Sequence, residues 1–325
     1  MSKMSGRSLG HSGIQVSPLG MGCWAIGGPW QLLGKPGGWG EVDDAESIRT
    51  IHAALGNGIS FFDTAANYGA GHSEDILGQA LRGRAGQAII ATKFGFEVDE
   101  AGKQVRRFAH DQDVLKNLPS DCERSLRHLR TDHIDLYQLH IWDYPVVPAA
   151  DVREALEKLV REGKIRAYGC STDSLELARV FAAGEHCAAI QHDLNVMMDA
   201  PEILALCEQQ DLASVNRSPL ARGALTGKYR TAPKFAQDDV RGEAWSINRF
   251  FAPTIEKLDA LRGILTSEGR TVTQGALAWI WARSGKTVPI PGIRTVAQAE
   301  ENAGAMARGP LKPEQMREIE TILGR

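Results

Sequence analysis

A regular alternation of short apolar runs and longer amphipathic segments is the feature that most constrains how this chain folds. The short runs, such as residues 88–92, are continuously apolar, which is typical of parallel strands buried on both faces. The longer segments carry apolar residues at helical spacing. The pattern predicts strands at 19–22, 59–63, 88–92, 134–139, 165–169, 188–191, 212–216 and 287–290, and helices at 43–56, 72–81, 113–129, 149–161, 175–182, 201–209 and 296–305.

Eight strands, nearly all followed by helices, over 325 residues favour a closed (β/α)8 TIM barrel over an open doubly wound sheet. We expect a single domain over residues 1–325. An N-terminal β-hairpin is predicted ahead of the barrel, with its turn at 11–13. Residues 94–111 and 217–251 are longer than ordinary loops, and both follow strands. They are therefore extended loops on the C-terminal face, where we expect them to act as lids.

Composition excludes several classes of protein. With 37 Lys and Arg against 40 Asp and Glu, the net charge is −3, and no basic surplus indicates nucleic-acid binding. The polar start has no apolar core of a secretory signal, and no run approaches the roughly 20 apolar residues of a membrane span. The five cysteines are scattered and no Cys/His cluster has metal-binding spacing. We expect a cytoplasmic protein without a metal, a membrane or a nucleic-acid partner.

Residues 20–25 satisfy the G-x-G-x-x-A pattern of a dinucleotide-binding Rossmann fold. Its context fails, because Ile26-Gly27-Gly28-Pro29 follows where a helix is required. Any nucleotide site must therefore be built in another way.

Four ionisable residues fall at or just after the ends of the second, third and fourth predicted strands: Asp63, Tyr68, Lys93 and His140. Each alone has an ordinary structural explanation, but together at one barrel mouth they form an acid/base apparatus. A buried Lys ammonium favours the phenolate and lowers the pKa of Tyr68. Asp63 is expected to keep Lys93 charged, and His140 to orient a carbonyl oxygen by hydrogen bonding.

The same motifs, with residues 163–171, 220–229, 290–292 and 301–302, resemble the aldo-keto reductase family in order and spacing from about Leu9 to Asn302. The resemblance implies a barrel that binds NADPH across its mouth and reduces aldehydes or ketones to alcohols by hydride transfer. Tyr68 is then the general acid, Lys93 lowers its pKa, Asp63 pairs with Lys93, and His140 positions the small-molecule carbonyl substrate.

The resemblance also implies the cofactor contacts. Ser171 and Gln191 hold the nicotinamide carboxamide, and Arg294 binds the 2′-phosphate. Pyrophosphate contacts fall at Ser218, Leu220, Gly223 and Lys228, and adenine contacts at Glu301 and Asn302. The remaining expected contacts are Gly22, Cys23, Trp24, Thr172, Pro219, Arg222, Leu225, Gly292 and Gln298. Thr172 stands where the family usually has Asn, and Gly292 and Gln298 replace a Lys and an Arg, so NADH remains a possible cofactor.

Trp24 and Trp142 are expected to shape the substrate pocket, with Trp30 or Trp39 beside them, whereas Trp279 and Trp281 are expected in the core or an interface. Two other functions stay open. One is an NADP(H)-binding regulatory protein that resembles potassium-channel β subunits and turns over slowly. The other is a Schiff-base aldolase with Lys93 as nucleophile. Neither the natural substrate, nor the favoured direction, nor the oligomeric state follows from the sequence.

Overall fold

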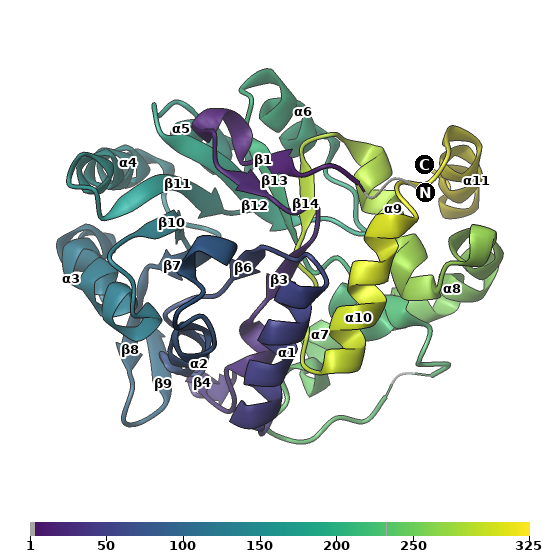
Figure 1. Cartoon of the computed structure of the whole chain (residues 1–325), viewed down its shortest axis with the longest axis horizontal. Helices are drawn as coiled ribbons and strands as arrows, with labels where there is room; N and C mark the ends of the chain where they lie inside the picture. Colours follow the sequence, from purple (N-terminus) through teal and green to yellow (C-terminus); the bar gives the residue numbers. More distant parts are fainter. Residues whose placement is uncertain (1–3, 232) are drawn as a thin grey trace.

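Eight parallel strands form the centre of the molecule and pair in chain order around a barrel (Figure 1). The computed structural model describes residues 4–231 and 233–325. A bridge between Gly22 and Gly292 closes the barrel, and the Gly22 N–H donates to the Pro291 carbonyl at 2.9 Å. This confirms the predicted (β/α)8 fold. The strands are β3 (Gly20–Gly22), β6 (Phe61–Asp63), β7 (Ile89–Phe94), β10 (Ile134–Leu139), β11 (Ile165–Ser171), β12 (Cys187–Asp193), β13 (Ala213–Arg217) and β14 (Thr287–Pro289).

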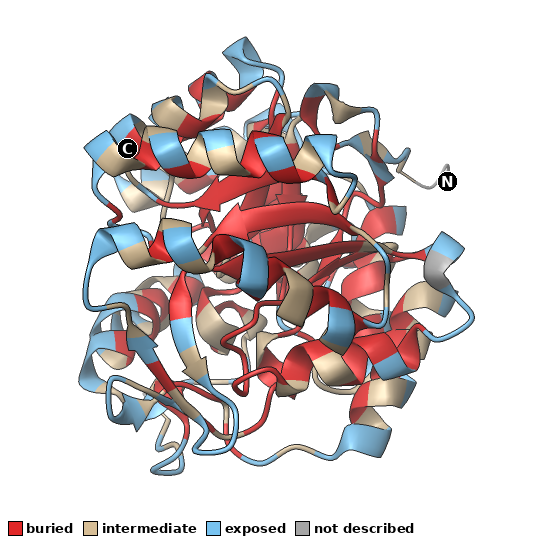
Figure 2. Ribbon diagram, turned by 90° about the vertical axis from the view of Figure 1, so that its left-hand side faces the viewer, coloured by how far each residue is buried: buried red, intermediate tan, exposed pale blue. Residues whose placement is uncertain are grey.

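Helices surround this barrel with their apolar faces inward, and Figure 2 shows buried strands behind helices whose outer faces are exposed. They are α1 (Asp44–Gly56), α2 (His72–Ala80), α3 (Asp111–Leu129), α4 (Val146–Arg161), α5 (Leu175–Ala182), α6 (Pro201–Gln209), α8 (Ala252–Leu265), α9 (Val272–Arg283), α10 (Val296–Gly304) and α11 (Pro313–Leu323). No helix in the described ranges is long and apolar enough to cross a membrane.

Local chemistry explains where helices begin. The Asp43 carboxylate accepts from the backbone N–H groups of Ala45 and Glu46 at the start of α1. Thr271 and Gln274 form a reciprocal capping box at the start of α9. Helix α9 lies between β13 and β14 in the chain, and its Trp279 and Trp281 are 0% and 4% exposed. Both tryptophans therefore belong to the core.

The N-terminal hairpin closes the barrel at its N-terminal end. Strands β1 (Arg7–Ser8) and β2 (Gln15–Val16) pair antiparallel, which confirms the predicted hairpin. Its apolar side chains are Leu9, Ile14 and Val16. They pack in one buried cluster with inward-facing strand residues that include Phe61, Ala91, Leu136, Ala167, Ala189, Val215 and Val288. The hairpin side chains therefore fill the base of the barrel against this layer of inward-facing strand residues.

A second, four-stranded sheet projects from the opposite end, below the barrel strands in Figure 1. It joins two loops far apart in sequence: β4 (Gln31–Leu32) and β5 (Lys35–Pro36) after β3, and β8 (Phe96–Asp99) and β9 (Gln104–Arg107) after β7. We call this the mouth sheet. The sequence pattern predicted an extended loop at 94–111 but not these strands, which are too short to show a period of two.

The second predicted lid, residues 217–251, contains short turns across the same opening in its described parts, 217–231 and 233–251. They are η4 (Ala221–Thr226), η5 (Val240–Gly242), α7 (Ala244–Ser246) and η6 (Ile247–Phe251). The Val240 N–H donates to the Gly38 carbonyl at 2.8 Å, and Trp39 pairs with Asp239. These bonds join the segment to the loop after β3, so the two cover the barrel mouth together.

Candidate active site

A chain of polar contacts joins three of the four predicted catalytic side chains. The Lys93 ammonium donates to Asp63 Oδ1 at 2.5 Å and to the Thr64 carbonyl at 2.8 Å. Its Nζ atom lies 3.5 Å from the Tyr68 hydroxyl and 5.0 Å from the centre of the Tyr68 ring. Asp63 ends β6 and Lys93 lies near the end of β7, so adjacent parallel strands place them together.

Burial and charge act against each other in this chain. Burial alone lowers the pKa of Lys93, but the Asp63 carboxylate and Tyr68 outweigh it and raise that pKa. The ammonium therefore stays charged. For Tyr68, burial is the largest influence and raises the pKa of the phenol, whereas Lys93 opposes it. The expected lowering by Lys93 is present, but desolvation exceeds it because the Tyr68 side chain is 9% exposed.

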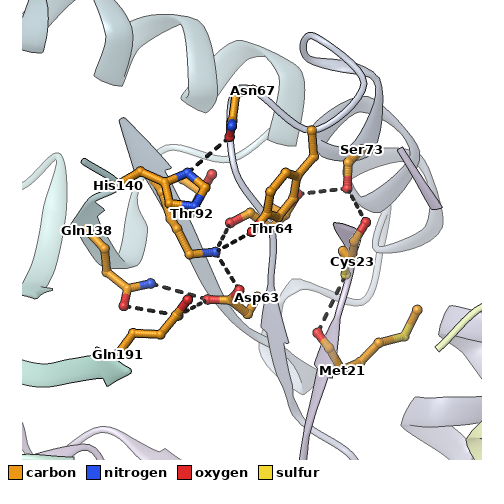
Figure 3. Close-up of polar contacts among 12 residues, drawn as sticks. Met21, Cys23, Asp63, Thr64, Asn67, Ser73, Thr92, Gln138, His140 and Gln191 are labelled. Atoms are coloured by element: carbon orange, nitrogen blue, oxygen red, sulfur yellow. Dashed lines mark hydrogen bonds and ion pairs between the residues drawn. The ribbon is translucent and has the colours of Figure 1, made fainter. Parts of the chain in front are cut away.

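His140 lies against the Tyr68 ring as a neutral imidazole. The two rings meet edge to face with centres 5.5 Å apart. Burial, and then the charges of Lys93 and Arg217, hold the pKa of His140 well below its usual value. Its Nδ1 atom lies 3.1 Å from Asn67 Oδ1, which fixes the ring orientation (Figure 3). Asn67 is a site residue that the sequence analysis missed.

Two amides hold the other oxygen of Asp63. Gln191 donates to Asp63 Oδ2 at 2.8 Å, and Gln138 donates to the same oxygen at 3.2 Å. Figure 3 shows both side chains converging on the carboxylate. The sequence analysis missed Gln138, although it lies on β10 only two residues before His140, which directly follows that strand.

A cavity of about 930 Å³ opens above these residues at the barrel mouth. Asp63, Tyr68 and His140 line it. So do most of the predicted cofactor and substrate contacts, namely Gly22, Trp24, Trp142, Ser171, Gln191, Ser218, Pro219, Leu220, Arg222, Gly223, Lys228, Gly292, Arg294, Gln298, Glu301 and Asn302. Within the described ranges, no group of three His, Cys, Asp or Glu residues has a metal-binding arrangement.

Three predicted cofactor contacts do not line the cavity. Cys23 is fully buried, with its Sγ directed to the Met21 carbonyl. The Thr172 hydroxyl donates to the Trp142 carbonyl at 2.7 Å and so is committed to the loop after β10. Leu225 packs in the apolar core. Lys93 is also absent from the lining, because it is 1% exposed beneath Asp63 and Tyr68.

Arg294 occupies the rim but already has protein partners. Its guanidinium donates to the Trp39 carbonyl at 2.9 Å and to the Glu41 carbonyl, and its backbone N–H donates to Gln298 Oε1 at 2.8 Å. Arg294 therefore ties the loop after β14 to the loop after β3. A guanidinium has five N–H donors, so this role leaves further donors for a ligand.

Aromatic side chains form much of the cavity wall. The Trp24 ring stacks on Tyr68 with centres 5.7 Å apart and meets Trp39 edge to face at 5.6 Å. Trp30 and Trp39 both line the cavity, as does Trp142, which is 47% exposed and lies beside Phe96 at 6.3 Å. The sequence analysis missed four further aromatic contributors to the wall, which are Phe96, Tyr229, Trp245 and Phe250.

Comparison with known proteins places this arrangement in a family. The sequence model of the Aldo/keto reductase family matches residues 18–323. Aldo-keto reductase YhdN from Bacillus subtilis is 34% identical over 324 residues, covering 97% of this chain and 92% of the relative. An aldo-keto reductase from Schizosaccharomyces pombe named for NADP(+) is 30% identical, covering 92% of this chain and 86% of the relative.

A solved structure agrees with the sequence matches. The glycerol dehydrogenase of Gluconobacter oxydans superposes with a TM-score of 0.83 at 32% identity, covering all of this chain and 96% of the other. The chain belongs to the aldo/keto reductase family, whose members are NAD(P)H-dependent oxidoreductases.

Proposed function

We propose that the protein is an NADPH-dependent reductase of aldehydes and ketones in which Tyr68 is the general acid. The observation that carries this proposal is the contact chain from Asp63 through Lys93 to Tyr68, with a neutral His140 beside the phenol at the cavity floor. Protonation of a carbonyl oxygen requires an acid, a charged group that stabilises the conjugate base of that acid, and a group that orients the oxygen. Tyr68, Lys93 and His140 match these three requirements.

Each of the four side chains has a separate role in proton transfer. Tyr68 holds its proton at neutral pH, because burial raises the pKa of the phenol. As that proton moves to the substrate oxygen, the phenolate that forms lies 3.5 Å from the Lys93 ammonium, which stabilises it. Asp63 keeps the ammonium charged and in place, and His140 orients the substrate oxygen. The cofactor supplies the hydride when bound.

The residues around the cavity fit a dinucleotide. Ser171 and Gln191, at the ends of β11 and β12, provide a hydroxyl and an amide for the carboxamide of the nicotinamide. Lys228 and Arg294 provide cations on the rim for phosphate groups, and Glu301 with Asn302 lies at the adenine end. The S. pombe relative, whose name states NADP(+), supports NADPH as the cofactor, and the departures at Gly292 and Gln298 keep NADH as a weaker one.

The Schiff-base aldolase is disfavoured by the position of Lys93. An amine nucleophile must be neutral and must reach the substrate. The pKa of Lys93 is raised by Asp63 and Tyr68, and its side chain does not line the cavity.

A fluorescence titration with NADPH and NADH, followed by 4-nitrobenzaldehyde in the same cuvette, tests the proposal. We expect tight NADPH binding and steady loss of nicotinamide absorbance. The Tyr68→Phe variant should bind NADPH equally well but lose activity by roughly 10²–10⁴-fold, the usual contribution of a general acid. Full activity in Tyr68→Phe would remove the acid assignment. NADPH binding without turnover on any carbonyl compound would instead support the regulatory role.

A further inference from the structure

Arg222 in the cavity wall differs from three neighbouring arginines, which are each paired with a carboxylate. Arg217 pairs with Asp173 at 2.5 Å, Arg241 with Asp239 at 2.5 Å, and Arg249 with Asp193 at 2.6 Å. Arg222 makes no ion pair with any carboxylate in the described part of the chain, and its buried Nε and Nη1 atoms have no hydrogen-bond partner.

Aromatic rings hold this guanidinium in place. The Arg222 Cζ atom lies 4.2 Å from the ring centre of Trp245, 4.8 Å from that of Trp24 and 4.9 Å from that of Phe250. The face of an aromatic ring attracts the cation, but it does not accept the hydrogen bonds that the N–H groups of the guanidinium donate within their own plane. Burial also lowers the pKa of Arg222, which reflects a poorly solvated charge. A buried charge with unused donors is costly unless a ligand supplies the missing anion.

Arg222 lies close to the reacting atoms. The Trp24 ring that it contacts stacks in turn on Tyr68, so a single indole separates the guanidinium from the catalytic phenol. The indole N–H of Trp24 is already bonded to the Gly37 carbonyl at 2.8 Å, which fixes the ring between the two. A compound with its carbonyl oxygen at Tyr68 extends naturally along this indole toward Arg222.

We propose that Arg222 binds the carboxylate of the substrate, so that the preferred substrates are aldehydes or ketones that carry a carboxylate group. This inference rests on the proposed reductase function and deepens it. A planar guanidinium pairs with a carboxylate through two parallel N–H bonds, one from Nη2 and the other from Nε or Nη1. In the described part of the chain, none of these three atoms of Arg222 donates a hydrogen bond. The cofactor pyrophosphate is the competing source of an anion, since Arg222 lies in the turn that also contains Gly223.

Two substrates that differ in charge show whether Arg222 binds the substrate carboxylate or the cofactor pyrophosphate. Wild-type kcat/KM is measured with 4-carboxybenzaldehyde and with its neutral methyl ester, methyl 4-formylbenzoate, and compared with Arg222→Met and Arg222→Lys. We expect the wild type to prefer the carboxylate and Arg222→Met to lose roughly 10–100-fold on it, as expected for charge-assisted hydrogen bonds, with little change on the ester. Arg222→Lys should retain part of the preference, because it keeps the charge but loses the planar fork.

The control is Arg107→Met, which removes a cation near the same opening that stacks on Trp142 and already pairs with Asp143. It should leave the ratio between the two substrates unchanged. An equal loss by Arg222→Met on both substrates, together with weaker NADPH binding, would assign Arg222 to the cofactor and overturn the proposal.

A binding measurement keeps the test independent of turnover. Tryptophan fluorescence is titrated with 4-carboxybenzyl alcohol, the product, in the presence of NADPH. Binding by the wild type and its loss in Arg222→Met support the proposal, and equal binding or no binding by both overturns it. Failure of the reductase function itself shows differently, as NADPH that is never oxidised with either aldehyde.

Discussion

The Lys93 ammonium lies 3.5 Å from the Tyr68 hydroxyl oxygen, close enough to favour the phenolate but too distant to overcome the burial of the phenol. The pKa of Tyr68 is therefore above its ordinary value of 10, and the acid form persists at neutral pH. In the proposed mechanism, the lysine stabilises the conjugate base as it forms and leaves the resting acid protonated.

This relationship predicts how the rate depends on pH. If Tyr68 is the acid, as proposed, carbonyl reduction needs the protonated phenol, so its kcat/KM should stay nearly constant from pH 6 to 9 and fall only at higher pH. Alcohol oxidation needs the phenolate and should rise over the same range. The Lys93→Met variant loses the ammonium that lowers the pKa of Tyr68. The rise of the alcohol oxidation rate with pH should therefore begin at still higher pH in this variant. Unchanged profiles in that variant would contradict the role given to Lys93.

Gln138 should act as a positioning residue for Asp63. Gln138→Leu removes one of two amide donors to Asp63 Oδ2, so we expect kcat to fall about tenfold, the value of a buried hydrogen bond to a charged group. NADPH affinity should not change. Gln191→Leu is the matched comparison, because it removes the other donor and also a proposed cofactor contact. If both variants weakened NADPH binding equally, Gln138 would not act on Asp63 alone, and this assignment would be contradicted.

Arg294→Ala should weaken NADPH much more than NADH. A lost guanidinium–phosphate pair costs about 1.5–3 kcal/mol, or roughly 10–100-fold in Kd. Because Arg294 also bonds to the Trp39 and Glu41 carbonyls, the variant loosens a loop as well. Titration with NADH measures that structural contribution, since NADH lacks the 2′-phosphate. Equal losses for both nucleotides would leave Arg294 with the loop role alone.

Gly22 should tolerate no side chain. A Cβ atom there would lie 2.7 Å from the Ile290 carbonyl oxygen, where the backbone of β3 meets the segment after β14. Gly22→Ala should lower the free energy of unfolding by about 1–3 kcal/mol, the usual cost of overpacking. Gly56→Ala in α1 meets no atom within 4 Å and serves as the control. Chemical denaturation of both variants checks the difference.

Acid should destabilise the fold partly through His192. Burial lowers the pKa of this histidine to about 4, against 6.5 for the ordinary side chain. Its Nε2 lies 2.7 Å from the Ser214 hydroxyl and its Nδ1 lies 3.1 Å from the Asp193 carbonyl. The unfolded chain binds the proton first, so stability is complete above pH 6.5 and falls as the pH drops toward 4, by at most about 3 kcal/mol.

The His192→Gln variant should therefore show a smaller loss of unfolding free energy over that pH interval than the wild type. Urea titrations at pH 7.5 and pH 4.5 measure the difference. A variant as acid-sensitive as the wild type would mean that other groups, such as the buried His140, account for the whole effect.

Sequence periodicity predicted the barrel well because the strands are short, largely apolar runs that alternate with amphipathic helices. The bounds of β10, α5 and α6 agree with the prediction to the residue. The mouth sheet was missed because strands of two to four residues, such as Gln31–Leu32, pair with partners distant in the chain. Their pairing depends on which loops the barrel brings together, and no local pattern records it.

The same distinction applies to the candidate site. Asp63, Lys93 and His140 could be predicted because strand ends meet at one mouth, and the resemblance added their expected roles. Asn67, Trp245 and Phe250 could not, since Trp245 and Phe250 come from the long segment that follows β13. Cys23 and Leu225 were expected at the cavity but are buried elsewhere, because a motif position does not fix where a side chain points. The single-domain organisation stays a prediction.

The mouth sheet has a consequence for how this enzyme can change over evolution. The residues proposed for proton transfer lie on or beside barrel strands, whereas β4, β5, β8 and β9 are built wholly from insertions between strands and helices. Substitutions at the exposed Leu33, in the turn between β4 and β5, alter the approach to the cavity without disturbing Asp63 or Lys93. Selectivity and chemistry can therefore diverge independently, and descendants of this chain can acquire new substrates while the proposed acid is retained.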